Sequence, residues 1–228
     1  MYTNILFDLD GTLTNSAFGI TESVRLALLH EGFDAPSHAD LVWVVGPPLR
    51  DSFAQLAKTT DTAVINRLLT KYRERFEPIG MFENEVYAGV QTVLETLRDD
   101  GYRLFLATSK PRVYAEKILR HFELEEYFDG IGGAELDGSI DSKADVIRTV
   151  LRTYDLSPES CLMIGDREHD VIGARENNIN TLGVTYGFGS ETELREAGAI
   201  CIVRTPVEIL QFIRDQKAET GSLSPSGR

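Results

Sequence analysis

The stretch "NILFDLDGT" (residues 4–12) contains the transition that decides the fold. Residues 4–7 have the length and the largely apolar, β-branched and aromatic content of a buried strand. Two aspartates follow, and the glycine after them lets the chain turn. Because side chains two residues apart in an extended segment point the same way, we expect Asp8 and Asp10 to face one pocket. Thr12 adds a hydroxyl beside them.

Four further short runs meet the same criteria for a strand. They span residues 103–107, 161–164, 181–184 and 200–203. Segments with helical spacing lie between them. At residues 90–97, for example, apolar side chains recur at i, i+3, i+4 and i+7. Strands that alternate with helices predict an α/β fold with a mostly parallel, Rossmann-like sheet.

Residues 16–82 interrupt this alternation, because they contain no convincing strand. Helical patterns occur there at residues 20–30, 40–45, 49–58 and 62–76. A structureless loop of this length would be unusual inside a compact domain. We therefore predict an inserted α-helical cap domain at residues 16–82 and a core made of residues 1–15 and 83–215. Residues 216–228 are polar and rich in Ser and Gly, and we expect a loose C-terminal tail.

The composition is that of a globular protein with an acidic surface. Of its 228 residues, 42% are hydrophobic, and the formal net charge is −13. Such a surface repels nucleic acid polymers and anionic membranes, but a local pocket can still bind a small anion. No run approaches about 20 apolar residues, and the N-terminal segment lacks the features of a signal peptide. With Cys161 and Cys201 both expected to be buried thiols, we expect a cytoplasmic protein, monomeric or dimeric.

Polar side chains follow three of the predicted strands. Asp8 and Asp10 follow the first, Thr108 and Ser109 follow the run at 103–107, and Asp166 follows the run at 161–164. In open α/β sheets, ligands bind at the carboxyl ends of the strands. Each feature alone has an ordinary explanation, since Asp-Gly is common in turns and Asp is a common helix N-cap.

Together, these aspartates and Asp170 would crowd one cleft. Like charges about 4 Å apart repel by about 4 kcal/mol per pair at an effective dielectric constant of about 20. A stable fold needs a cation to compensate, and hard carboxylate oxygens without clustered His or Cys favour Mg²⁺. Lys143 lies at the predicted start of a helix, in "DGSIDSKADVI" (residues 137–147), where the helix dipole disfavours it. By position alone it would be an exposed lysine. Mg²⁺ with carboxylates, hydroxyls and a lysine is typical of phosphoryl transfer.

Four motifs resemble, in order and spacing, those of the haloacid dehalogenase-like hydrolases, most of which are phosphatases. "FDLDGT" is similar to the first motif, Thr108 in "LFLATSKP" to the second, Lys143 to the third and "IGDREHD" to the fourth. The resemblance implies that Asp8 is a nucleophile that forms an aspartyl-phosphate. It implies that Asp10 is the general acid and then the general base. Thr108 and Lys143 would stabilise the charge of the transferring phosphoryl group.

The resemblance also implies a Mg²⁺ site. The ligands would be the carboxylates of Asp8 and Asp166 and the backbone carbonyl of Asp10, which leaves the Asp10 side chain free. Asp170 would support the metal waters or Lys143, and Ser109 and Thr12 would assist.

The cap of such enzymes covers the active site. In this sequence "VGPPLRDSF" (residues 45–53) would face it, which makes Gly46 and Arg50 candidates for substrate binding. Arg50 could equally be an ordinary surface arginine. Residues 71–76 ("KYRERF") are expected to be an exposed helix face.

The segments "MIGDREHDVIGARENNI" and "YGFGSETEL" resemble members labelled 5′-nucleotidase or phosphoglycolate phosphatase. We therefore expect Mg²⁺-dependent hydrolysis of a small phosphorylated metabolite, with nucleoside 5′-monophosphates favoured and 2-phosphoglycolate as the alternative. A sugar phosphomutase would use the same core. A non-catalytic binding protein on this scaffold would lack a catalytic residue, yet all are present. Dehalogenases of this superfamily lack the second aspartate, so Asp10 argues against dehalogenation.

Overall fold

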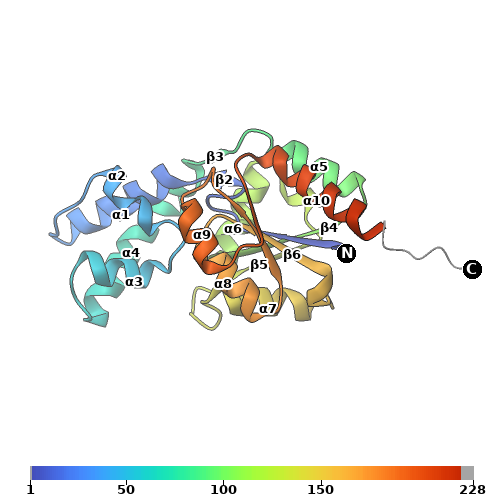
Figure 1. Ribbon diagram of the computed structural model, residues 1–228. Helices are drawn as coiled ribbons and strands as arrows, with labels where there is room; N and C mark the ends of the chain where they lie inside the picture. Colours follow the sequence, from blue (N-terminus) through green and yellow to red (C-terminus); the bar gives the residue numbers. More distant parts are fainter. Residues whose placement is uncertain (1, 222–228) are drawn as a thin grey trace, which may run out of the picture.

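The computed structural model describes residues 2–221, and a six-stranded parallel sheet forms its centre (Figure 1). The strand order is β5-β4-β1-β6-β7-β8. The strands are β1 (Asn4–Phe7), β4 (Arg103–Pro111), β5 (Gly130–Ala134), β6 (Cys161–Gly165), β7 (Asn180–Val184) and β8 (Cys201–Val203). Every neighbouring pair in this sheet is parallel. The predicted α/β fold class is confirmed.

Helices cover both faces of the sheet, and the strands are accordingly apolar on both sides. On β1, Ile5 and Phe7 belong to one apolar cluster, whereas Leu6 belongs to the cluster on the other face. The first face is covered by α5 (Val90–Asp99), α6 (Arg112–His121) and α10 (Pro206–Gly221). The second is covered by α7 (Lys143–Thr153) and α8 (Glu168–Glu176), and α9 (Glu191–Ala197) packs against α8. Full burial of each large apolar side chain contributes about 1.5–3 kcal/mol.

Strand β5 was not predicted, because "GIGGA" consists of three glycines, one alanine and a single branched residue, Ile131. Close packing explains the glycines. A Cβ at Gly130 would lie 2.1 Å from the ring of Tyr154, and one at Gly132 would lie 2.3 Å from Val150. Val150 belongs to α7, and Tyr154 directly follows this helix. The glycines therefore let α7 pack closely against β5, the strand at the edge of the sheet.

Four helices are inserted between the first strand and the rest of the core, and Figure 1 shows them gathered at one side of the sheet. They are α1 (Ala17–His30), α2 (His38–Leu41), α3 (Leu49–Leu56) and α4 (Thr62–Phe76). Short 3₁₀ turns lie among the inserted helices at Val42–Val44 and Gly80–Phe82, and in the core at Glu125–Tyr127 and Pro158–Ser160. The chain enters the inserted helices after β2 (Thr14–Asn15) and returns through β3 (Glu85–Val86), which pairs with β2 in antiparallel fashion. The predicted domain bounds at 16 and 82 fall beside this pair, and we retain them as a proposal.

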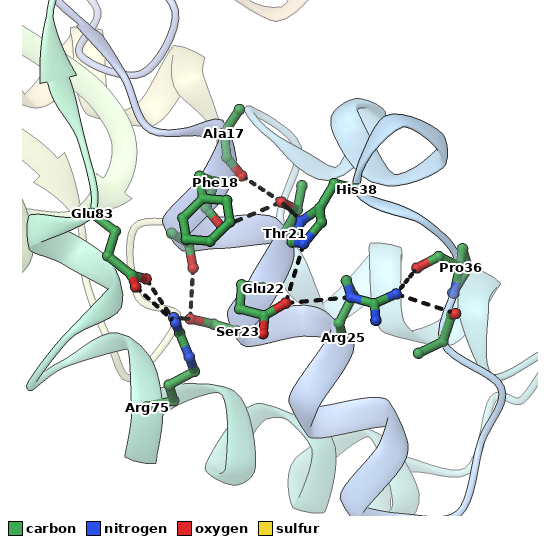
Figure 2. Close-up of polar contacts among 12 residues, drawn as sticks. Ala17, Phe18, Thr21, Glu22, Ser23, Arg25, Pro36, His38, Arg75 and Glu83 are labelled. Carbon is green, nitrogen blue, oxygen red and sulfur yellow. Dashed lines mark hydrogen bonds and ion pairs between the residues drawn. The ribbon is translucent and has the colours of Figure 1, made fainter.

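The base of the cap is tightly connected. A Cβ at Gly19 in α1 would lie 1.9 Å from the carbonyl oxygen of Gly80, so the two backbones touch. Arg75 of α4 joins the same region, because it contacts Ser23 at 3.0 Å and Glu83 at 2.8 Å (Figure 2). The segments that enter and leave the cap are therefore bound to each other through α4.

Two expectations need correction. Cys161 is buried as expected, but Cys201 is half-buried because β8 is the outermost strand of the sheet. The predicted loose tail begins too early, since α10 continues through residues 216–221 in helical form. Residues 222–228 lie outside the described residues. Among residues 2–221, no helix has both the length and the apolar character needed to cross a membrane.

Candidate active site

Three aspartates meet at the carboxyl edge of the sheet. Asp8 follows β1 and Asp166 follows β6, and these strands are neighbours in register. Asp170 lies in the first turn of α8. All three are buried, and one carboxylate oxygen of each lies within 4.8 Å of the others. The structure thus brings together Asp8, Asp166 and Asp170, three of the four aspartates that the sequence analysis singled out.

Lys143 lies in the middle of these carboxylates. Its Nζ is 2.7 Å from Oδ1 of Asp8 and 2.8 Å from Oδ1 of Asp170, and it donates to the carbonyl oxygen of Ala107 at 2.9 Å. Only 6% of the residue is exposed. A Cβ at Gly173 of α8 would lie 2.8 Å from Cγ of Lys143, so this glycine lets α7 and α8 approach closely enough to bring the lysine in. These partners explain a lysine at a helix N-terminus.

Asp166 is held from two sides. The hydroxyl of Thr12 donates to its Oδ1 at 3.3 Å, and the backbone N–H of Phe188 donates to its Oδ2 at 2.7 Å. A Cβ at Gly11 would lie 2.1 Å from Oδ2, and Gly11 also has a φ of +86°. Only glycine satisfies both conditions, which gives a physical reason for the "DGT" sequence.

The charges of this cluster favour a divalent cation. Three carboxylates and one ammonium leave a net charge of −2 in a buried space. Burial raises the pKa of Asp166 well above its ordinary value, and the charges of Asp170 and Asp8 raise it further. Burial also raises the pKa of Asp170, although Lys143 opposes this. Burial alone would lower the pKa of Lys143, but Asp170 and Asp8 raise it above its ordinary value. Hard oxygen donors with this charge fit Mg²⁺.

Asp10 points to a partner that the sequence analysis did not assign. Its Oδ2 lies 2.6 Å from Nζ of Lys110, and both side chains are buried. The other carboxylate oxygen of Asp10 is buried without a hydrogen-bond partner among the described residues. Lys110 follows Thr108 by two positions at the end of β4, where a bulge shifts the register. The same spacing of two that pairs Asp8 with Asp10 could have indicated it.

The aspartates Asp8 and Asp10 form the floor of a cavity of about 240 Å³ between the sheet edge and the cap. Thr108 and Ser109 line its side, and Thr108 is buried with its hydroxyl 3.2 Å from the backbone N–H of Lys110. The cavity therefore also contains the hydroxyls predicted at the end of this strand.

The roof of the cavity comes from the cap. Gly46 and Arg50 both line it, as expected, and Arg50 is exposed and donates to Asn66 at 2.9 Å. The expectation that residues 71–76 form an exposed helix face is wrong. Tyr72 and Phe76 are buried and line the cavity, with their rings stacked 5.0 Å apart. Burial raises the pKa of Tyr72, and the nearby Asp10 raises it further, so its hydroxyl is a neutral hydrogen-bond donor.

A capped, parallel α/β core with an aspartate–lysine cluster at its carboxyl edge defines a class of hydrolytic enzymes. Residues 5–184 match the family model described as haloacid dehalogenase-like hydrolase, and the chain belongs to this family. It is 48% identical over 194 residues to a protein of Pseudomonas aeruginosa named 5′-nucleotidase, covering 85% of this chain and 87% of that one.

Two further comparisons, one with a solved structure and one with a curated relative, show what else the chain is similar to. A crystal structure titled as a predicted phosphatase from Clostridium acetobutylicum superposes with a TM-score of 0.91 at 45% identity, covering 94% of this chain and 99% of that one. The tyrosine-protein kinase PtkA of Mycobacterium tuberculosis is 40% identical over 187 residues, which are 81% of this chain but 62% of PtkA. The chain is an enzyme of a hydrolase family whose relatives include named phosphatases.

Proposed function

We propose that the protein is a Mg²⁺-dependent phosphomonoester hydrolase that works through an aspartyl-phosphate on Asp8. One observation carries this proposal: Asp8 lies on the floor of the cavity with the ammonium of Lys143 2.7 Å from its Oδ1. A buried carboxylate held by a cation is a nucleophile with a fixed direction of attack. The proposal is also supported by the membership of the chain in the haloacid dehalogenase-like hydrolase family.

The metal would be held by Asp8, Asp166 and the backbone carbonyl of Asp10, with Asp170 and Thr12 supporting these groups. When bound, Mg²⁺ supplies positive charge that stabilises the oxygens of the transferring phosphoryl group. Thr12 and the N–H of Phe188 orient Asp166, and Asp170 holds Lys143 in place.

In the first step, an oxygen of Asp8 forms a bond to phosphorus as the ester P–O bond breaks. The leaving oxygen takes a proton from Asp10. In the second step, water attacks the phosphorus of the aspartyl-phosphate, Asp10 accepts its proton, and phosphate and Asp8 are released. Lys143 and Thr108 stabilise the phosphoryl oxygens in both steps. A phosphate beside Lys110 would give this ammonium another anionic partner and so free Asp10 from its ion pair.

We propose nucleoside 5′-monophosphates as the substrate class. The relative named 5′-nucleotidase, at 48% identity over most of both chains, supports this choice. The cavity also offers room beyond the phosphate site, where Tyr72, Arg50 and Arg73 can donate hydrogen bonds to a sugar or base. A leaving group of mixed polar and apolar character suits such a roof.

Phosphate release should be measured with nucleoside 5′-monophosphates, 2-phosphoglycolate, pyrophosphate and hexose 1-phosphates, with Mg²⁺ and with EDTA. We expect the highest kcat/KM for a nucleotide, activity only with Mg²⁺, and a loss of at least about 1000-fold for Asp8→Asn. Full turnover by Asp8→Asn would disprove the mechanism. Conversion of a hexose 1-phosphate into its isomer without phosphate release would instead identify a phosphomutase, and a preference for 2-phosphoglycolate would overturn the substrate assignment.

A further inference from the structure

Arg167 connects the aspartate cluster to the roof of the cavity. It directly follows Asp166 and is the N-cap of α8. Its backbone N–H donates to Oδ2 of Asp170 at 3.0 Å. Its side chain reaches across to the cap, where Nη1 donates to the carbonyl oxygen of Val45 at 2.7 Å. Arg167 thus links two regions. It belongs to the segment that carries Asp166 and Asp170, and it contacts the cap at Val45, which is 122 positions away in the sequence.

The side chain of Arg167 has a fixed course. Its Nε is 2.8 Å from Oε1 of Glu193, which also accepts from the backbone N–H of Glu168 at 2.9 Å. A Cβ at Gly189 would lie 3.3 Å from Cδ of Arg167, so the loop before α9 encloses the stem. Only 14% of the side chain is exposed. Burial raises the pKa of Glu193, but the hydrogen bond and charge of Arg167 together with hydrogen bonds from backbone N–H groups outweigh it, and the pKa lies below its ordinary value. Glu193 is therefore an anionic anchor at neutral pH.

The contact on the cap lies at the start of the roof. Val45 is followed by Gly46, Pro47 and Pro48, which line the cavity, and we call residues 45–48 the roof turn. Gly46 has a φ of +109°, and a Cβ there would lie 3.3 Å from Cγ of Arg167. The two prolines stiffen the turn. Fixing the carbonyl of Val45 therefore fixes the position of the whole turn.

The cap can transmit this contact because it is rigid at its base. Arg75 binds Ser23 and Glu83 together where the chain enters and leaves the cap (Figure 2). A further polar contact between cap and core is the hydrogen bond that Tyr114 donates to Glu77 at 2.5 Å, at the C-terminal end of α4. A rigid unit that is connected through β2 and β3 takes its orientation from such contacts with the core.

We propose that Arg167 is a positioning residue that latches the roof turn to the loop bearing Asp166 and Asp170, with Glu193 as its anchor. This contact, which we call the latch, makes the position of the roof turn depend on the segment that bears Asp166 and Asp170. Its kinetic consequence rests on the proposed phosphatase function, whereas its structural consequence does not. Loss of the latch should loosen the roof turn, weaken the binding of substrates that touch the roof, and leave the aspartates in place.

The test compares Arg167→Met with Arg175→Met. Arg175 is a matched control, because it lies on the same helix and its Nη1 also donates to a backbone carbonyl, that of Ala197 at 3.0 Å, within the core. Backbone hydrogen exchange of the peptide that covers residues 42–50 is measured in both. We expect faster exchange there in Arg167→Met by on the order of tenfold, with no change in Arg175→Met.

The kinetic arm uses AMP and acetyl phosphate as substrates. For Arg167→Met we expect KM for AMP to rise by on the order of tenfold with a smaller change in kcat, and a smaller rise for acetyl phosphate, which is too short to reach the roof. The Mg²⁺ concentration for half-maximal activity should stay within about twofold, because the contact to Asp170 uses the backbone of Arg167.

Unchanged exchange of residues 42–50 in Arg167→Met, or equal acceleration in Arg175→Met, would overturn the proposal. If Arg167→Met does not fold, Arg167→Lys replaces it. Lysine is shorter and has no separate donors that correspond to Nε and Nη1, so it should hold Glu193 and Val45 less well; an intermediate acceleration is expected, and wild-type exchange would overturn the proposal. If no substrate is hydrolysed, the proposed function fails while the exchange comparison still decides whether the latch exists.

Discussion

The floor and the roof of the cavity are built in different ways. On the floor, Asp8 is joined at 2.7 Å to the buried Lys143, which in turn contacts the buried Asp170 at 2.8 Å. The roof is mixed, since Tyr72 and Phe76 are buried whereas Gly46 is half-buried and Arg50 is exposed. Many contacts hold each floor residue in a single position. The roof is held by a few contacts between residues that are far apart in the sequence. The difference leads us to propose that the floor determines the reaction and the roof determines the substrate.

Apart from replacement of the proposed nucleophile Asp8, the largest effect is expected at Asp10. Replacement Asp10→Asn removes the proton donor, and kcat/KM should fall by about 10²–10⁴. The loss should be greater for an alkyl phosphate than for p-nitrophenyl phosphate, whose leaving group needs no proton. Steady-state assays with both esters check this, with the exposed Asp99→Asn as control. Equal losses for the two esters would show that Asp10 is not the general acid.

Lys143 tests whether the buried carboxylates depend on its ammonium group. Replacement Lys143→Met should lower kcat by about 10²–10³, because a group that stabilises the phosphoryl charge is lost. It should also lower the free energy of unfolding by about 3–5 kcal/mol, because buried carboxylates lose their cation. Urea unfolding and activity assays measure both, with the exposed Lys117→Met as control. Wild-type stability for Lys143→Met would contradict a buried cluster of this charge.

The pH dependence of stability has a definite sign. The raised pKa values of Asp166 and Asp170 mean that the folded, metal-free protein binds more protons than the unfolded chain. Their contribution to stability is present below the ordinary pKa of 3.8 and is lost as pH rises through the raised values. The melting temperature of the metal-free protein should therefore be higher at pH about 5 than at pH about 7.5, by about 2–4 °C for each kcal/mol of free energy of unfolding.

Mg²⁺ should reverse this trend, because it neutralises the same carboxylates. Its stabilising effect is expected to be larger at pH about 7.5 than at pH about 5, and Asp166→Asn should weaken it at both. Thermal melting with Mg²⁺ and with EDTA measures the effect. A Mg²⁺ effect that is independent of pH, or unchanged in Asp166→Asn, would place the metal elsewhere.

The smallest effect is expected at the roof. Arg50→Ala should raise KM for a nucleotide only severalfold and leave the melting temperature unchanged, because the side chain is exposed and its hydrogen bond to Asn66 stays within the cap. The change in kcat for a minimal substrate such as acetyl phosphate should be smaller still. A large fall in kcat with acetyl phosphate would show that Arg50 takes part in the chemistry and that the distinction between floor and roof is wrong.

The sequence predicted the floor because its geometry is local. Alternation along a strand brings Asp8 and Asp10 together, and parallel strands bring their ends to one edge. The roof depends on tertiary contacts that no local pattern contains. The spacing of Tyr72 and Phe76 places them on one helix face, but not on the face that meets the cavity. Similarly, nothing near Arg167 in the sequence indicates that it reaches Val45.

The most direct test of the mechanism is to identify the phosphorylated residue. The enzyme is mixed with a nucleoside 5′-monophosphate and Mg²⁺, quenched in acid within the first turnover, digested, and mapped by mass spectrometry. We predict one phosphoryl group on the peptide that contains Asp8, removable by hydroxylamine, absent in Asp8→Asn and longer-lived in Asp10→Asn. A phosphoryl group on any other residue, or rapid turnover with no phosphorylated peptide at any quench time, would contradict the account.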